Sequence, residues 1–223
     1  MPKISDIRPK IDAIDNQLLE LLDQRAELVK QVGAIKASQG DSASFIRSGR
    51  EADMARNLLN TTHSLPKTAL YQIWRIIISS SLQIENGLNI YTTHVNATPD
   101  SCRLIQQYFG IKPIFEDTNQ KVIEQLQQCG TCVGVFSSGS WWQQLQGTEI
   151  KIFAKLPFMA EDTSQPLYLA AKITPEPSDK DKTLIITDTP TNDKPIAQCN
   201  GQYLYEQDGF KKGGQVIGNY GVL

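Results

Sequence analysis

The chain has 223 residues, 40% of them hydrophobic, which is enough for two domains with cores of their own. Its formal net charge is only −2, with 11 of the 22 lysines and arginines before residue 88 and 11 after it, so neither half has the composition of a nucleic-acid binder. No apolar run approaches the roughly 20 residues that span a bilayer, and the segment MPKISDIRPKID lacks the apolar core of a signal peptide, so we expect a cytoplasmic protein with no membrane partner.

The first predicted element is a long amphipathic helix. Ser5 is a candidate N-cap, and Pro9 falls in the opening turn, where a missing N–H is tolerated. The periodicity runs to about Ala37, which gives some 30 residues and a length of about 45 Å. Such a helix is too long to be covered by the rest of its own chain. Its apolar residues alternate four and three apart, as a packed helix requires, and they are Ile7, Ile11, Ile14, Leu18, Leu21, Leu28, Val32 and Ile35.

Arg25 occupies the position in this apolar seam where the next leucine is expected. A cation in a packed seam costs on the order of several kcal/mol unless an anion meets it. No acidic residue of the same stretch shares its stripe. We therefore expect the missing partner of Arg25 to be an anionic ligand.

Lys36 lies on nearly the same side of the helix as Arg25. The two are three turns apart, so their side chains project within about 20° of each other and roughly 16 Å apart along the axis. Arg8 is about 25 Å from Arg25 and cannot reach a ligand held between them. An antiparallel second copy would bring its own Arg8 to that ligand and cover the seam, so we predict a homodimer with shared sites. The alternative is that Arg8 is a solvated residue of the first turn.

Two shorter helices follow. Ser48 and Glu51 have the spacing of a capping box, which predicts a second helix over roughly 49–62. Ser64 and Pro66 open a third helix that ends by residue 87. The first 87 residues are therefore expected to form an all-helical domain.

The composition changes after Gly87 to an alternation of strand and helix patterns. This pattern predicts an α/β domain over residues 88–223, whose later part is richer in strands. The expected helices lie near residues 98–109, 118–128 and 139–146, and the expected strands span 88–95, 112–117, 131–138, 149–156, 167–173 and 182–188.

The remaining reactive residues give weaker indications. Four cysteines are too few for a disulfide framework in a chain of this size, and Cys129 and Cys132 are interpreted as small core residues, with redox or metal chemistry as the alternative. The turn 137–140 follows a predicted strand and precedes a predicted helix, where backbone N–H groups can hold an anion, although such turns are common. Trp141 and Trp142 are interpreted as packing residues. We predict no metal and no cofactor.

The N-terminal motifs resemble the all-helical (type II) class of chorismate mutases. The resemblance covers about residues 4–86, and it is carried by RPKIDAID at 8–15, LLELL at 18–22, RAELV at 25–29, VGAIK at 32–36 and Arg50-Glu51. It implies an intertwined, three-helix dimer that converts chorismate to prephenate in phenylalanine and tyrosine biosynthesis. This reaction is a one-step rearrangement of a small dicarboxylate, and it needs only conformational restraint and charge stabilisation at the breaking ether oxygen.

The resemblance also implies roles for individual residues. Arg25 and the Arg8 of the partner chain hold the carboxylates, and Lys36 donates to the ether oxygen and to a carboxylate. Arg50 lies in the family's Arg-Glu pair, and Glu51 accepts from the substrate hydroxyl, unless the capping box accounts for it. Arg47 stands where relatives often carry an acid that helps to hold that hydroxyl.

Ser81 and Glu85 share one face of the third helix. By resemblance Ser81 lines the site, and Glu85 replaces a glutamine that faces Lys36 across the ether oxygen. A glutamate donates a hydrogen bond only when it is protonated. We therefore expect turnover to fall as the pH rises, unless Glu85 is simply a solvated residue near the helix end.

The second domain resembles prephenate dehydratase only weakly, in its strand–helix order and in the segment 167–187, and it lacks the Thr-Arg-Phe triplet of that family. We therefore interpret it as a noncatalytic or regulatory extension. The alternatives are a helical dimerisation module that carries a small-molecule-binding domain, and a bifunctional mutase and dehydratase.

Overall fold

The computed structural model describes residues 3–39, 45–61, 64–137, 139–159 and 164–223. Within these ranges the α-helices are α1 (Ile4–Gln39), α2 (Ser48–Asn60), α3 (Lys67–Asn86), α4 (Pro99–Phe109) and α5 (Asn119–Gln128), and two short 3-10 segments are η1 (His94–Asn96) and η2 (Trp141–Leu145). The strands are β1 (Asn89–Thr93), β2 (Ile114–Glu116), β3 (Cys132–Phe136), β4 (Ile150–Leu156), β5 (Leu167–Lys172), β6 (Asp181–Thr187), β7 (Ala197–Cys199), β8 (Gln202–Asp208) and β9 (Val216–Gly221).

The three predicted N-terminal helices are confirmed, with differences at their starts. Helix α1 begins at Ile4, so Ser5 lies inside it and Pro9 lies in its second turn. Pro9 is tolerated there because this turn is exposed, and water can satisfy the carbonyl that loses its N–H partner. Helix α2 begins at Ser48 with Arg47 as its N-cap, and no side-chain hydrogen bond caps it. The predicted capping box is therefore wrong.

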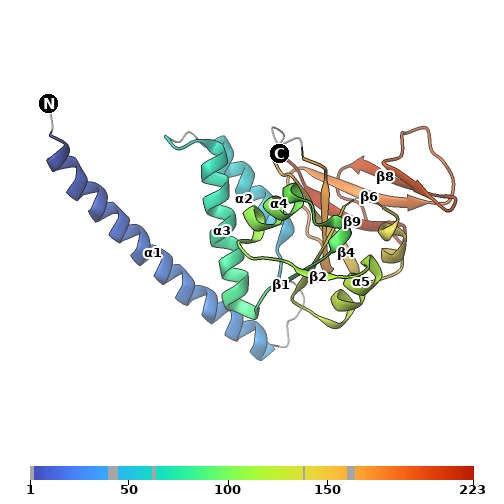
Figure 1. Cartoon of the computed structure of the whole chain (residues 1–223), viewed down its shortest axis with the longest axis horizontal. Coiled ribbons are helices and arrows are strands. Elements are labelled where there is room, and N and C mark those ends of the chain that lie inside the picture. Colours follow the sequence, from blue (N-terminus) through green and yellow to red (C-terminus); the bar gives the residue numbers. More distant parts are fainter. Residues whose placement is uncertain (1–2, 40–44, 62–63, 138, 160–163) are drawn as a thin grey trace.

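Helix α1 extends away from the rest of the chain. Its C-terminal half meets the C-terminal half of α3, whereas its N-terminal half projects freely (Figure 1). With 36 residues it is about 54 Å long, more than the rest of the helical region can cover. None of the helices in the part of the chain that the structure describes has the length and apolar character needed to cross a membrane.

The strands of the described chain form one nine-stranded mixed sheet in the order β2-β1-β3-β5-β4-β9-β6-β8-β7. Strands β2, β1 and β3 are parallel and are connected through α4 and α5, while β5 runs antiparallel to both β3 and β4. The six predicted strands and the helices near 98–109 and 118–128 are confirmed. The segment 139–146 is a 3-10 turn rather than an α-helix, and the prediction missed β7, β8 and β9.

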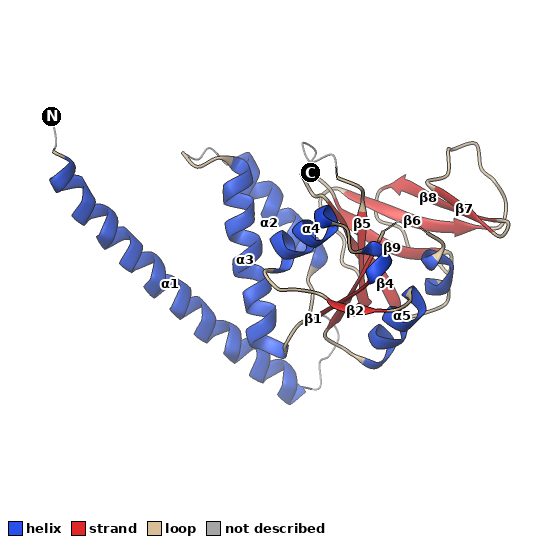
Figure 2. Cartoon of the chain, in the orientation of Figure 1, coloured by secondary structure: helices blue, strands red, loops and turns tan. Residues whose placement is uncertain are grey.

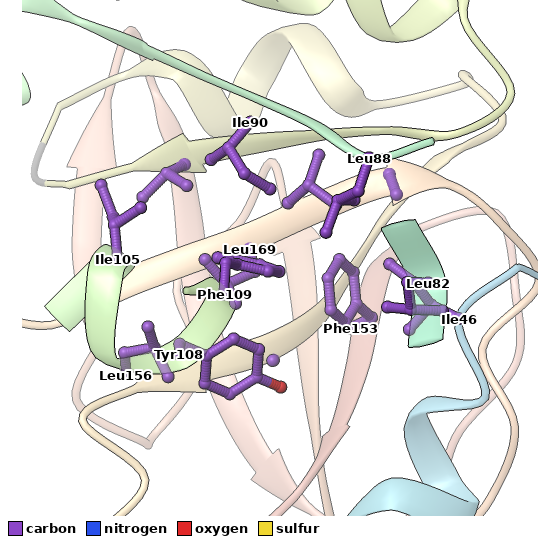
Figure 3. Close-up of a cluster of buried hydrophobic side chains, with 14 of the residues drawn as sticks. Ile46, Leu82, Leu88, Ile90, Ile105, Tyr108, Phe109, Phe153, Leu156 and Leu169 are labelled. Atoms are coloured by element: carbon purple, nitrogen blue, oxygen red, sulfur yellow. The ribbon is translucent and has the colours of Figure 1, made fainter. Parts of the chain in front are cut away.

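Two apolar cores lie on opposite faces of the sheet. One contains α5, η2 and the buried Trp141 and Trp142, as expected of packing residues. The other gathers α3 and α4 over β1, β3, β4 and β5 (Figure 2). This second core also includes Ile46, from the segment before α2, and Leu82 of α3, which lie close to Phe153 of β4 (Figure 3). The helical region and the α/β region therefore share one core.

Two features of the α/β region, a disulfide and a partly buried, hydrogen-bonded glutamate, were not predicted. Cys132, at the start of β3, lies in the apolar core, and Cys129, at the end of α5, packs against it, as interpreted, but the disulfide that joins them was not predicted. On the sheet, Lys155 Nζ lies 2.8 Å from Glu206 Oε2, and the Tyr220 hydroxyl also donates to Glu206. Burial alone would raise the pKa of Glu206, but these two hydrogen bonds hold that pKa below its ordinary value.

Candidate functional site

The crossing of α1 and α3 brings together the charged residues that the sequence singled out. Gly33 of α1 sits directly against Glu85 of α3, and a Cβ added at Gly33 would lie 3.1 Å from both Cγ and the backbone oxygen of Glu85. The absence of a side chain at Gly33 thus lets the two helices approach closely. On either side of this contact, α1 presents Arg25 and Lys36 towards α3.

Arg25 contacts α3 through neutral acceptors. Among the described residues its guanidinium donates to the Ser81 hydroxyl and to the Ile77 carbonyl, and no carboxylate pairs with it. Burial, followed by the nearby charge of Arg50, lowers the pKa of Arg25. Arg25 and Arg50 are therefore close enough to repel each other, and this part of the site favours an anion.

Lys36 and Glu85 form an ion pair. Lys36 Nζ lies 2.5 Å from Glu85 Oε1, and the Glu85 side chain is only 9% exposed. The sequence predicted that these two residues would face each other, and the structure brings them together. Each group satisfies the other, so any ligand atom that enters between them must replace this contact.

Glu51 also has a protein partner. Arg75 Nη1 of α3 donates to Glu51 Oε2 at 2.7 Å, and the two side chains are 4% and 12% exposed. The guanidinium carbon of Arg75 lies 3.6 Å from the centre of the Tyr108 ring in α4. Sequence reasoning missed Arg75, although a basic residue between Trp74 and Ile76 in an apolar helix is the same kind of signal as Arg25.

The other predicted site residues lie further out. Arg47 is exposed and pairs with Glu176 of the α/β region, with Arg47 Nε 2.6 Å from a Glu176 oxygen. Arg8 lies in the exposed N-terminal half of α1, within the same continuous helix as Arg25. Their separation of 17 residues, about 25 Å along this helix, excludes a shared small ligand within one chain.

The apolar seam of α1 is not the surface that contacts α3. The contact uses the neighbouring stripe, in which Ala26, Val29 and Lys36 are partly covered and Gly33 is buried. The predicted seam residues are 41% to 61% exposed, and they are Ile7, Ile11, Ile14, Leu18, Leu21, Leu28, Val32 and Ile35. Single exposed apolar residues are ordinary, whereas a continuous exposed stripe of this length is unusual for a surface that only water covers.

The structure thus defines a helical region whose surface carries a cationic site beside an uncovered apolar stripe. Comparison with known proteins assigns this region: residues 7–86 match the family model of chorismate mutase type II. The segment 7–86 therefore belongs to that family, as its motifs indicated.

Similar proteins extend the comparison. The chain is 32% identical over 95 residues to the bifunctional chorismate mutase/prephenate dehydratase of Aquifex aeolicus (strain VF5), a match that covers 40% of this chain and 26% of that relative. It is 28% identical over 92 residues to the protein of the same description from Pseudomonas aeruginosa, covering 40% of this chain and 25% of the relative. The chain thus spans about a quarter of the length of the curated relatives it matches. No solved structure matches the chain significantly.

Proposed function

We propose that this protein is a cytoplasmic chorismate mutase that rearranges chorismate to prephenate in aromatic amino acid biosynthesis. The observation that carries the proposal is Arg25, a cation that lies at the α1–α3 crossing and close to a second cation, Arg50. Its partners among the described residues are neutral acceptors. A small dicarboxylate supplies the charge that this arrangement lacks. The family match of residues 7–86 and the names of the relatives support the same reaction.

The site suits a rearrangement that forms no covalent intermediate. Arg25 binds one substrate carboxylate through its guanidinium fork, and Ser81, which accepts from it, orients that fork. Lys36 donates to the ether oxygen as charge develops there. Arg50 adds positive charge at the start of α2, Arg47 reaches the substrate only by leaving Glu176, and Glu51 accepts from the substrate hydroxyl. Within the described residues no group of His, Cys, Asp and Glu side chains is arranged to hold a metal ion, and the proposed chemistry asks for neither metal nor cofactor.

Glu85 is the least conventional member of this set. Its carboxylate accepts a hydrogen bond from Lys36. To donate to the ether oxygen, Glu85 must take up a proton when the substrate separates it from Lys36. Turnover is then greatest at acidic pH and falls as the pH rises.

The proposed active form is an intertwined homodimer. A second copy of α1, packed antiparallel on the exposed stripe, covers the apolar side chains that one chain leaves in water. The same packing brings Arg8 of the partner subunit to the site that contains Arg25. One antiparallel arrangement thus both buries the stripe and completes the cationic site.

The α/β region is proposed to be noncatalytic or regulatory. A bifunctional mutase and dehydratase is the second candidate, because the matched relatives carry both activities in their names. Incubating the protein with prephenate distinguishes the two, since the bifunctional enzyme would release phenylpyruvate. A helical dimerisation module that presents a binding domain predicts neither reaction.

The test of the main proposal is direct measurement of chorismate disappearance by the purified chain and by Arg25→Ala. We expect turnover in the wild type and a loss of at least about 100-fold in the variant, the effect of removing one major electrostatic donor. No turnover in the wild type would refute the proposal.

The shared site has a separate test. Arg8→Ala and Arg25→Ala chains, each inactive alone, are mixed and allowed to exchange subunits. In each heterodimer one site keeps both arginines, so random exchange should restore about a quarter of wild-type activity. If no activity returns although heterodimers form, Arg8 does not act across the interface.

A further inference from the structure

Helix α2 is docked on the α/β region by small residues. A Cβ added at Gly49 would lie 2.3 Å from the carbonyl oxygen of Pro177, and one added at Gly221 of β9 would lie 2.2 Å from the Cβ of Ala52. At both positions the backbone of the glycine lies directly against the opposite segment, so neither glycine can carry a side chain without displacing α2. Helix α2 therefore rests directly on the segment around Pro177 and on β9.

Polar contacts fix the same helix along its length. Asp53 Oδ1 accepts from the backbone N–H of Asp179 at 2.9 Å. Arg56 donates to the carbonyl oxygens of Lys180, at 3.3 Å, and Val222. Together with the Arg47–Glu176 ion pair, these contacts hold α2 from its N-cap to its third turn. The helix is thus positioned by residues that are more than 120 positions later in the chain.

The buried Arg75 joins this docking to Glu51, the proposed acceptor of the substrate hydroxyl. Its guanidinium stacks on Tyr108 of α4 and donates to Glu51 of α2, so it joins all three helices. Among the described residues Arg75 is the sole side-chain partner of the Glu51 carboxylate, and it contacts Oε2, which leaves Oε1 to accept another donor. Burial raises the pKa of Tyr108 to about 12, so the ring stacks on the guanidinium as a neutral phenol.

We propose that the α/β region sets the position of the substrate-hydroxyl acceptor in the mutase site, with Tyr108 holding Arg75 and Arg75 holding Glu51. This inference rests on the proposed mutase function and deepens it. Arg75 and Tyr108 are positioning residues, because they act on the substrate through Glu51. The α/β region is accordingly part of the working mutase rather than an appended unit.

The geometry explains why two residues are needed. Without the Tyr108 ring, the Arg75 guanidinium loses the face against which it is packed and can turn away from α2. Without Arg75, Glu51 is a largely buried carboxylate that turns towards any remaining donor. In both cases α2 remains docked through Gly49 and Asp53, while the carboxylate loses its orientation.

The experiment measures KM and kcat for chorismate in the full chain carrying Tyr108→Leu, with Tyr108→Phe as the matched control. Tyr108→Phe keeps the ring and should leave both constants unchanged. Tyr108→Leu removes the ring and should raise KM by roughly three- to thirtyfold, the range expected for a lost cation–π contact, with little change in kcat. Arg75→Lys, which keeps the charge but not the planar fork, should change KM in the same direction.

Repeating Tyr108→Leu in a Glu51→Ala background shows whether Tyr108 positions Glu51 or only stabilises the fold. If Tyr108 acts through Glu51, the second substitution adds nothing to KM, whereas general loosening of the fold adds its full effect in both backgrounds. Thermal melting identifies any variant that fails to fold. If Tyr108→Leu does not fold, the KM of Arg75→Lys tests the positioning role instead. An unchanged KM in a folded Tyr108→Leu or Arg75→Lys chain would overturn the inference and leave the mutase proposal intact. A wild-type chain without turnover would instead refute the mutase proposal, and this inference with it.

Discussion

Replacing Leu18 by aspartate tests whether a second chain covers the stripe on α1. Leu18 is 53% exposed and lies in the half of α1 that projects freely (Figure 1). Complete burial of a leucine side chain contributes about 1.5–3 kcal/mol, so covering its exposed half contributes about 1 kcal/mol. Placing a carboxylate in the same packed position costs a further ~3 kcal/mol or more.

A twofold dimer carries this substitution twice, so the loss is on the order of 8 kcal/mol per dimer. At about 1.4 kcal/mol for each factor of ten, Leu18→Asp should weaken association by roughly 10⁵- to 10⁶-fold. Sedimentation velocity from nanomolar to high micromolar concentrations measures this change. Chorismate turnover in the same samples should fall together with the dimer fraction, because the partner subunit supplies Arg8.

The matched control is Val95→Asp, which introduces the same charge at an apolar residue of the α/β region that is 86% exposed. This variant should dimerise and turn over chorismate as the wild type does. If the Leu18→Asp chain stays dimeric and fully active, the α1 stripe is not the dimer interface and the shared-site model is wrong.

Three further predictions concern single residues. Glu85→Gln should flatten the fall in turnover with rising pH, and a variant profile identical to that of the wild type would sink the assignment of Glu85 as donor. Gly49→Ala should lower the melting temperature by several degrees, because its Cβ would lie 2.3 Å from a carbonyl oxygen. The control is Gly130→Ala, whose Cβ meets nothing within 4 Å and which should leave the melting temperature unchanged. Equal melting temperatures of the two variants would argue against tight docking of α2. Glu206 has a lowered pKa in the folded protein, so its ionised form stabilises the fold above the ordinary glutamate range and this contribution is lost as the pH falls through the folded value. Glu206→Gln should therefore lower the free energy of unfolding by on the order of 1 kcal/mol at pH 7 and reduce its acid dependence; urea titrations at pH 7 and pH 3 that show wild-type behaviour would contradict this.

Helices α1 to α5 and strands β1 to β6 could be predicted because their signals are local. The four-and-three spacing of apolar residues specifies α1 without any knowledge of its neighbours. Strand β9 could not be predicted in this way, since Gly218 and Gly221 interrupt its pattern. Those glycines are explained only by the close approach of Ile152 and Ala52, which lie far away in the sequence.

Part of the candidate site could likewise be predicted from the sequence, and part could not. Arg25 and Lys36 were recognisable because each breaks or flanks a periodic pattern on one helix, and Glu85 followed from family motifs. Arg75 also breaks an apolar helix, but its pairing with Glu51 was not recognisable, because the two residues meet only when α2 packs against α3. Sequence patterns reveal residues that are unusual within their own element, but not residues whose surroundings come from another one.

The docking of α2 has a consequence for the order in which the protein folds. Arg56 finds one of its acceptors, the carbonyl of Val222, only 166 residues further along the chain. During synthesis α1 and α3 are made before β9, which receives α2, so the side of α2 that carries Ala52 stays uncovered until β9 is made. The helical region is therefore made before the surface that completes its packing.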